Sequence, residues 1–260
     1  MVFIYNKESL KQVRGFSMKI VCFGDSLTRG VTFFKGRLRI LKNNYPACLQ
    51  QLIRADDEHP EIGQAEVVNK GVFNDTSDSL LSRLEKDVFY ENPDYVIIGI
   101  GGNDCDFKWK EVAESPTEEH QARVPLGRYA DNLRELISQM RSNGITPILT
   151  TLPPLDPVYY YQTISKRFGT EVSQWICKVG GIASWHSTYN RTVHHIAEEM
   201  GVYLIDVRNA IKRTGQLQGL ISEDGIHLTE KGYKVMAAEI YRKVVNLSNR
   251  KMVTVKSPVR

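Results

Sequence analysis

The chain has 260 residues, of which 42% are hydrophobic and 25% are charged, the composition of a globular protein with one sizeable core or two small ones. Its formal net charge of +4 at pH 7 equals the charge of a C-terminal tail, residues 248–260, which has four basic residues and no acidic one. The rest of the chain is therefore close to neutral. Because nucleic-acid-binding proteins usually concentrate basic residues on a folded face, the sequence predicts no nucleic-acid partner.

Cysteine usage and apolar runs indicate location and domain organisation. The four cysteines include no C-x-x-C pair and no histidine lies at zinc-binding spacing, which predicts reduced, mostly buried thiols and no metal site. No apolar run reaches the roughly 18 residues of a membrane span, and the first residues contain too few apolar positions for a signal peptide. We expect a cytoplasmic protein with an N-terminal extension (1–17), a single domain (18–247) and the basic tail.

Five short apolar runs predict β-strands. They cover residues 19–23, 65–69, 95–100, 146–152 and 202–207. Each run is continuously apolar and does not alternate with polar residues, which is typical of a parallel sheet whose two faces are both covered.

Stretches with helical periodicity separate these strands. Segment 46–55 follows the first strand, segment 77–88 is expected to begin with a serine cap, and apolar stripes cover residues 129–140 and 233–244. Alternating strands and helices predict right-handed crossovers. The expected fold is a three-layer α/β/α sandwich around a flavodoxin-like, five-stranded parallel sheet.

Two long stretches, residues 105–125 and 153–182, interrupt this alternation. Insertions of this length usually carry function or a small substructure. We expect aromatic residues in and next to them to form a wall over the substrate, and the alternative is a cluster that packs only on itself. These residues are Trp109, Tyr159, Tyr160, Tyr161, Trp175 and Trp185. His194 and His195 flank an apolar stripe and are predicted to lie on a helix surface.

Polar segments follow the first three strands at their carboxyl ends, where ligands bind in open α/β sheets. They are Gly24-Asp25-Ser26, Asn69-Lys70-Gly71 and Gly101-Gly102-Asn103-Asp104. Taken singly, each is also typical of a turn. A fourth segment favours a shared site, because Asp224 lies three residues before His227, just ahead of the last predicted helix. At this spacing a carboxylate can hold an imidazole while the second ring nitrogen faces a nucleophile.

The four segments together resemble the motif blocks of the SGNH hydrolase superfamily, also called the GDSL esterase/lipase family. The matches are "FGDSLTRG" with Ser26, "NKGVFNDTS" with Gly71, "GGND" with Asn103, and "DGIH" with Asp224 and His227. All four occur in the family's order across residues 20–235. One departure is Asn74, which stands where the family often has a glycine.

The resemblance implies a serine hydrolase in which Ser26 is the nucleophile, His227 the general base and Asp224 the residue that orients it. It also implies an oxyanion hole formed by the Ser26 and Gly71 amides and the Asn103 side chain. Glycine at position 71 is then expected because a side chain would crowd the acyl group. This chemistry needs no cofactor and no metal. The G-x-S-x-G motif of the α/β-hydrolase fold is absent from the sequence.

The expected reaction is hydrolysis of small-molecule carboxylic esters with small or medium acyl groups, through an acyl-enzyme on Ser26. O-acetylated carbohydrates are among the candidate substrates, and an acyl-thioesterase or a lysophospholipase is an alternative within the same chemistry. A module that binds a ligand without reacting is the alternative from another class, although it would not need Ser26, Asp224 and His227 together. The sequence leaves the oligomeric state open.

Overall fold

The computed structural model describes residues 18–255, and at position 61 and positions 248–255 it describes the backbone only. The expected N-terminal extension, residues 1–17, lies outside the described residues, as do residues 256–260 of the expected tail. The last helix continues to Val255, so residues 248–255 of that tail are helical. Among the helices of the described residues, none has the length and apolar composition needed to cross a membrane.

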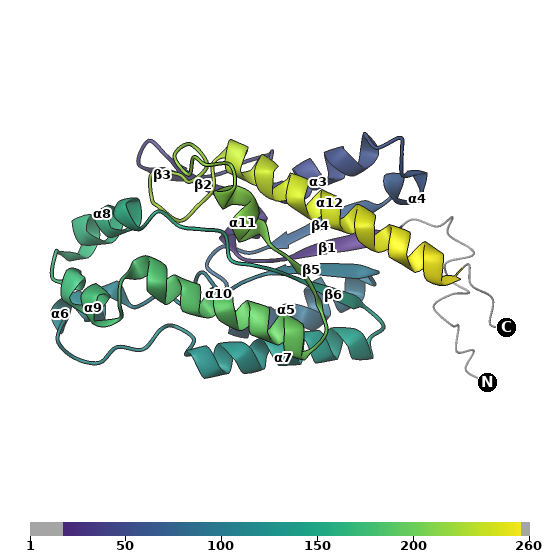
Figure 1. Ribbon diagram of the computed structural model, residues 1–260. Coiled ribbons are helices and arrows are strands. Elements are labelled where there is room, and N and C mark those ends of the chain that lie inside the picture. The colour runs from purple at the N-terminus through teal and green to yellow at the C-terminus, as the bar shows by residue number, and fades with distance from the viewer. Residues whose placement is uncertain (1–17, 256–260) are drawn as a thin grey trace.

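The five predicted strands form one sheet in the order β4-β1-β5-β6-β7, with every neighbouring pair parallel (Figure 1). Their bounds are β1 Lys19–Gly24, β4 Glu66–Gly71, β5 Tyr95–Gly99, β6 Thr146–Thr150 and β7 Tyr203–Ile205. β4 runs two residues beyond its predicted end, so Gly71 pairs with Gly24 of β1 and does not lie in a loop. β7 is shorter than predicted, because the chain enters a helix at Val207.

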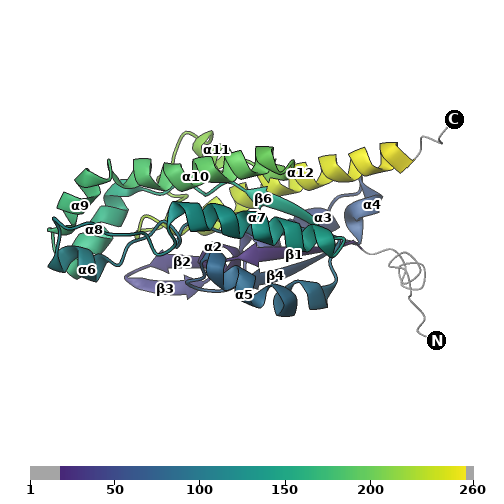
Figure 2. The ribbon, with the colours of Figure 1, turned by 90° about the horizontal axis from the view of Figure 1, so that it is seen from below.

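Helices cover both faces of the sheet and confirm the predicted three-layer sandwich (Figure 2). One layer contains α3 (Tyr45–Arg54), α11 (Val207–Lys212) and α12 (Glu230–Val255), and the other contains α5 (Ser77–Asp87), α7 (Leu126–Ser142) and α10 (Ile182–Glu199). Alternate residues of β1 enter the two cores, with Phe23 in one and Cys22 in the other. Burial on both faces explains why the strands are continuously apolar.

Of two predicted details of the helices, one was wrong and one is confirmed. Thr76, rather than the expected serine, occupies the cap position of α5, and its backbone N–H donates to the Ser79 hydroxyl at 3.4 Å. His194 and His195 are exposed on α10, as predicted.

The two insertions form a small helical subdomain beyond the carboxyl edge of the sheet (Figure 1). It contains α6 (Trp109–Glu114), α8 (Pro157–Phe168) and α9 (Val172–Lys178), which contact one another. The remaining short helices are α2 (Ser26–Arg29), α4 (Pro60–Gly63) and η1 (Phe89–Glu91).

A β-hairpin that was not predicted follows α2. Its strands are β2 (Val31–Phe34) and β3 (Arg37–Ile40), which pair antiparallel and form a separate sheet. Lys35 and Gly36 have φ angles of 50° and 74°, and two positive φ values in a two-residue loop are typical of a type I′ turn. Most of the hairpin is exposed, so it has no continuous apolar run of the kind that identified the other strands.

Candidate active site

The end of β1 places Ser26 at the start of a one-turn helix. Asp25 caps this helix by accepting a hydrogen bond from the Leu27 backbone N–H at 2.9 Å. Gly24 is needed just before the turn, because a Cβ there would lie 2.3 Å from the carbonyl oxygen of Gly99 on the neighbouring strand. The Ser26 side chain therefore reaches the carboxyl edge of the sheet on a tightly packed turn.

The structure brings Ser26, His227 and Asp224 together as the sequence predicted. His227 Nε2 lies 3.0 Å from Ser26 Oγ, and His227 Nδ1 lies 2.5 Å from Asp224 Oδ2. All three residues are buried. A hydroxyl, an imidazole and a carboxylate in this order form the relay of serine hydrolases.

The loop of residues 222–227 holds the carboxylate of this relay. Asp224 Oδ1 accepts hydrogen bonds from the backbone amides of Ile226 and His227, each at 3.1 Å, and lies 2.9 Å from the Ser222 hydroxyl. Burial raises the pKa of Asp224, but its hydrogen bond to His227, the His227 charge and the two amides outweigh that effect, so the pKa is lowered overall. Asp224 is therefore an anion at neutral pH.

Gly71 does not fit the oxyanion role expected for it. Its backbone N–H donates to Asn69 Oδ1 at 2.8 Å, so this donor already has a partner within β4. A Cβ at this position would lie 2.1 Å from Arg29 N and 2.5 Å from Thr28 C, both in the backbone of α2. Glycine is needed here because α2 packs directly on β4, and crowding of an acyl group is not the reason.

Asn103 lies beside Ser26 and lines the same cavity. Its Nδ2 donates one hydrogen bond to the Asp75 carbonyl oxygen at 2.8 Å, which leaves the second hydrogen of the amide available. Asn74, the residue before this carbonyl, has φ of 71°, a left-handed conformation that asparagine adopts more readily than most residues. The sequence showed this departure from glycine, but it did not show that the turn at Asn74 and Asp75 contacts Asn103.

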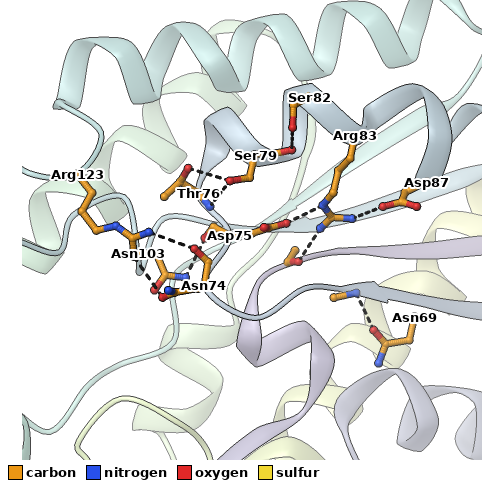
Figure 3. A network of polar contacts seen from close by, with 12 residues as sticks. Asn69, Asn74, Asp75, Thr76, Ser79, Ser82, Arg83, Asp87, Asn103 and Arg123 are labelled. Atoms are coloured by element: carbon orange, nitrogen blue, oxygen red, sulfur yellow. Dashed lines mark hydrogen bonds and ion pairs between the residues drawn. The ribbon is translucent and has the colours of Figure 1, made fainter.

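A polar network fixes the segment that carries Asn74 and Asp75 (Figure 3). The Arg83 guanidinium contacts Asp75 Oδ2 at 2.6 Å, Asp87 Oδ2 at 2.8 Å and the Gly24 carbonyl oxygen at 3.0 Å. Arg83 thereby connects the turn after β4 to the end of β1, next to the nucleophile. None of these contacts was predicted from the sequence.

A cavity of about 90 Å³ extends from Ser26 and Asn103 along the carboxyl edge of the sheet. Its lining is mostly apolar, and much of it comes from the helical subdomain and the start of α10. These residues include Phe107, Trp109, Tyr160, Ile176, Val179, Ile182 and Trp185. Of the six aromatic residues expected to form a wall, Trp109, Tyr160 and Trp185 line this cavity. Trp175 instead packs edge-on against Phe107, and Tyr159 is exposed.

Asp106 joins the two insertions inside this wall. Its Oδ1 accepts hydrogen bonds from the Tyr160 hydroxyl at 2.5 Å and from Trp109 Nε1 at 2.7 Å. The Trp109 Nε1–H also lies 2.8 Å from the Tyr160 hydroxyl oxygen. Burial raises the pKa of Asp106, and these hydrogen bonds oppose the shift. One carboxylate therefore fixes two aromatic rings of the cavity.

Two further buried groups line the cavity. Burial raises the pKa of Asp25 to about 7, and Asp104 and Asp75 add to the effect while the Leu27 amide and His227 oppose it. Burial lowers the pKa of His186 to about 3, helped by the nearby positive charge of Arg208. Because Arg208 can only donate, its contact with His186 Nδ1 at 3.1 Å makes His186 a neutral imidazole with its proton on the other nitrogen.

Comparison with known proteins places this chain among ester-cleaving enzymes. It is 26% identical to an acetylxylan esterase of Geobacillus stearothermophilus, over 88% of this chain and 95% of that protein. It is 26% identical to an isoamyl acetate-hydrolyzing esterase 1 homolog of Bos taurus, over 86% and 80%. An uncharacterized lipoprotein of Bacillus subtilis, YqeF, is 27% identical over 86% and 87%.

Solved structures show the same fold. The crystal structure of the G. stearothermophilus acetylxylan esterase, Axe2, superposes with a TM-score of 0.61 at 26% identity, covering 88% of this chain and 95% of that one. A lipase/acylhydrolase from Enterococcus faecalis superposes with a TM-score of 0.64 at 21% identity, covering 88% and 96%. The family model of GDSL-like lipases/acylhydrolases matches residues 20–240. The chain therefore belongs to the GDSL-like lipase/acylhydrolase family and is an ester-hydrolysing serine hydrolase.

Proposed function

We propose that this hydrolase cleaves carboxylic esters with an apolar acyl group of small to medium size, through an acyl-enzyme on Ser26. One observation carries the proposal: the serine of the Ser26, His227 and Asp224 relay opens directly into a cavity with apolar walls. Catalytic mutants of the G. stearothermophilus esterase carry alanine in place of a serine, a histidine or an aspartate, the three residue types of this relay.

The relay supplies each proton transfer of the reaction. His227 Nε2 accepts the proton of Ser26 Oγ as that oxygen attacks the acyl carbon, and it then protonates the leaving alcohol. In the second half-reaction, His227 Nε2 takes a proton from water as the water oxygen attacks the acyl carbon. It then returns the proton to Ser26 Oγ, which releases the acid and regenerates the serine. The Asp224 carboxylate stabilises the imidazolium that forms in both half-reactions, and its lowered pKa keeps it ionised for this purpose.

The oxyanion of the tetrahedral intermediate needs donors that Gly71 does not supply. We assign them to the Ser26 amide, the second hydrogen of Asn103 Nδ2 and the Asn74 backbone N–H, for which the described residues contain no hydrogen-bond acceptor. Asn103→Ala should lower kcat by about 10²- to 10³-fold, because it removes one oxyanion donor. Asn74→Gly should retain activity, because it keeps the N–H and suits the positive φ. A large loss in Asn74→Gly would contradict this assignment.

The cavity walls favour an acyl chain over a sugar in this position. Aromatic and aliphatic side chains gain free energy by covering apolar groups, at about 25 cal/mol per Å² buried. A carbohydrate would need several polar partners there, whereas the polar groups of Asp106, Tyr160 and Trp109 are already paired with one another. An acetylated sugar is an alternative substrate if its acetyl group enters the cavity and its sugar lies outside. A thioester or a lysophospholipid fits the same acyl cavity with another leaving group.

Hydrolysis of p-nitrophenyl esters of increasing acyl length tests the proposal. We expect kcat/KM to rise from acetate to butyrate, and Ser26→Ala to abolish turnover of every ester. Trp109→Ala should change the chain-length preference, whereas Tyr159→Ala, at an exposed position outside the cavity lining, should not. A preference for acetate that neither variant changes would contradict an acyl role for the cavity. It would favour deacetylation of a larger alcohol.

We also propose a cytoplasmic location and a small-molecule substrate without a nucleic-acid partner. The four cysteines are free thiols, which supports a reducing compartment. One relative bears the name of a lipoprotein, so the location needs a direct measurement. Fractionation of cells that express the full chain would give it, and recovery outside the cell, or in a membrane fraction from which high salt does not release the protein, would contradict the cytoplasmic location.

A further inference from the structure

Most of the exposed large apolar side chains lie on segments at the carboxyl edge of the sheet, the edge that carries the site. Eight large hydrophobic residues are exposed within the described part of the chain, and six lie on segments at the carboxyl edge of the sheet. These six are Phe34, Leu38 and Ile40 of the hairpin, Phe73 after β4, and Val158 and Tyr159 at the start of α8. The other two, Tyr90 and Tyr203, lie before β5 and at the start of β7, on the amino edge. Exposed apolar residues concentrated on the edge that carries the site are unlike the scattered exposure normal for a protein surface.

The hairpin and α8 flank the catalytic loop of residues 222–227. The Phe33 backbone N–H donates to the Ser222 hydroxyl at 3.3 Å, and the Asp156 backbone N–H donates to the Gly225 carbonyl oxygen at 2.9 Å. Both elements project beyond the same edge of the sheet (Figure 2). A surface that contacted their tips would therefore face the loop that carries His227.

The hairpin combines these apolar side chains with positive charge. Its strand register places Leu38 and Ile40 on one face, with Phe34, Arg37 and Arg39 on the other. No aspartate or glutamate occurs between Ser26 and Ala55, whereas Lys35 and Lys42 add two more charges at and just after the hairpin. Exposed aromatic and aliphatic residues among basic ones are typical of segments that insert into the interface of an anionic bilayer.

We propose that the β2–β3 hairpin docks the protein on an anionic phospholipid surface, with the mouth of the active site turned toward the lipid. The exposed apolar side chains of the hairpin enter the headgroup layer, and Lys35, Arg37 and Arg39 contact lipid phosphates. A second copy of the chain fits this surface less well, because two hairpins with the same positive charge repel each other and basic side chains on a strand oppose edge pairing. The inference concerns binding and holds whatever ester the site cleaves.

Co-sedimentation with vesicles tests the docking, with all proteins carrying Ser26→Ala so that hydrolysis plays no part. We expect binding to vesicles of phosphatidylcholine with about one third phosphatidylglycerol and little binding to phosphatidylcholine alone. Arg37→Glu with Arg39→Glu should weaken binding about 100-fold or more, because each basic residue near the surface contributes about a 5-fold factor and each reversal adds repulsion. Raising the salt concentration should weaken the wild-type interaction.

A matched control separates the hairpin from overall charge. Arg54→Glu with Lys86→Glu makes the same change in net charge at exposed positions away from the hairpin, and it should leave binding nearly unchanged. Phe34→Ser with Ile40→Ser should also weaken binding, whereas Tyr90→Ser with Tyr203→Ser should not. Thermal unfolding of each variant, and hydrolysis of a water-soluble ester with Ser26 restored, should match the wild type.

Three results would overturn the proposal. The first is a wild-type protein that does not sediment with anionic vesicles. The second is an equal loss of binding in the hairpin and control variants, which would indicate nonspecific attraction. The third is a dimer that the hairpin substitutions convert to monomers in analytical ultracentrifugation without vesicle binding by either form, which would identify the hairpin as an interface between copies.

Discussion

The two halves of the site are constructed in different ways. In the reactive half, backbone amides hold Asp224, a glycine allows the turn before Ser26, and buried hydrogen bonds fix the relay. In the cavity half, side chains from the helical subdomain pack on one another, and Asp106 connects its two insertions. Backbone groups therefore position much of the reactive half, whereas side-chain packing positions most of the cavity half.

This difference predicts different tolerance to change. A polar relay depends on particular atoms at hydrogen-bond distance, so a single isosteric replacement removes its function. A packed apolar wall loses contacts gradually, because neighbouring side chains partly compensate for a lost group. Substrate preference should therefore change more easily in this protein than the reaction does. Four substitutions test this contrast, from the largest expected effect to the smallest.

The largest effect is expected at Asp224. Asp224→Asn keeps the shape of the side chain but removes the charge that stabilises the His227 imidazolium, so kcat should fall by about 10³- to 10⁴-fold. Glu223→Gln is the matched control, since it neutralises the preceding, exposed carboxylate. Steady-state hydrolysis of p-nitrophenyl butyrate measures both. A similar loss in the two variants, or none in Asp224→Asn, would contradict the relay.

Gly71→Ala should have the next largest effect, on stability. The added Cβ would collide with the backbone of α2 at Arg29, so we expect unfolding to become easier by about 3 kcal/mol or more. Gly63→Ala is the control, because the nearest atom to its Cβ would be 3.9 Å away. Chemical denaturation gives both values. If Gly71→Ala were as stable as wild type but inactive, the oxyanion role that the structure argues against would be restored.

Asp25→Asn should change how stability depends on pH. Because folding raises the pKa of Asp25 from 3.8 to about 7, the folded state binds more protons than the unfolded state between these values. This carboxyl therefore costs stability progressively as pH rises from about 4 to 7. The variant should lose that dependence and gain stability relative to wild type at pH 8. Chemical denaturation of both proteins at pH 4 and pH 8 measures the difference. An equal change in unfolding free energy between the two pH values in wild type and variant would refute the raised pKa of Asp25.

Tyr160→Phe should have the smallest effect. It removes the hydroxyl that donates to Asp106 and leaves the Trp109 hydrogen bond in place, so we expect a loss of about 1–2 kcal/mol in unfolding free energy. KM for longer acyl esters should rise while kcat for the acetate ester changes little. Tyr159→Phe, at the exposed neighbouring position, is the control. A collapse of kcat for every ester would show that the wall and the relay are not separable.

Local sequence patterns predicted most of the fold and the reactive half. Asp224 and His227 lie within one turn, so their contact has a local signal, whereas the pairing of His227 with Ser26, 201 positions away, was expected from the resemblance of the four motif blocks to the GDSL family. Gly71 was assigned the wrong reason, because its close neighbour is α2, a contact that only the three-dimensional packing reveals.

The remaining features depend on contacts between distant segments. Arg83 reaches the end of β1 from α5, and Asp106 meets Tyr160 across 54 positions of sequence, so neither contact has a local signal. Phe107 lines the cavity although no periodicity distinguishes it from a core residue. The Lys35-Gly36 turn is a local sequence signal for the hairpin. Its exposed strands, however, lack the continuous apolar run that predicted the other strands.

The most direct test of the central claim is intact-mass measurement after treatment with a fluorophosphonate. The account predicts one label per chain, located on Ser26 by peptide mapping, no label in Ser26→Ala, and much slower labelling in His227→Ala. Labelling of another residue, or equal labelling rates in wild type and His227→Ala, would contradict a nucleophile activated by His227.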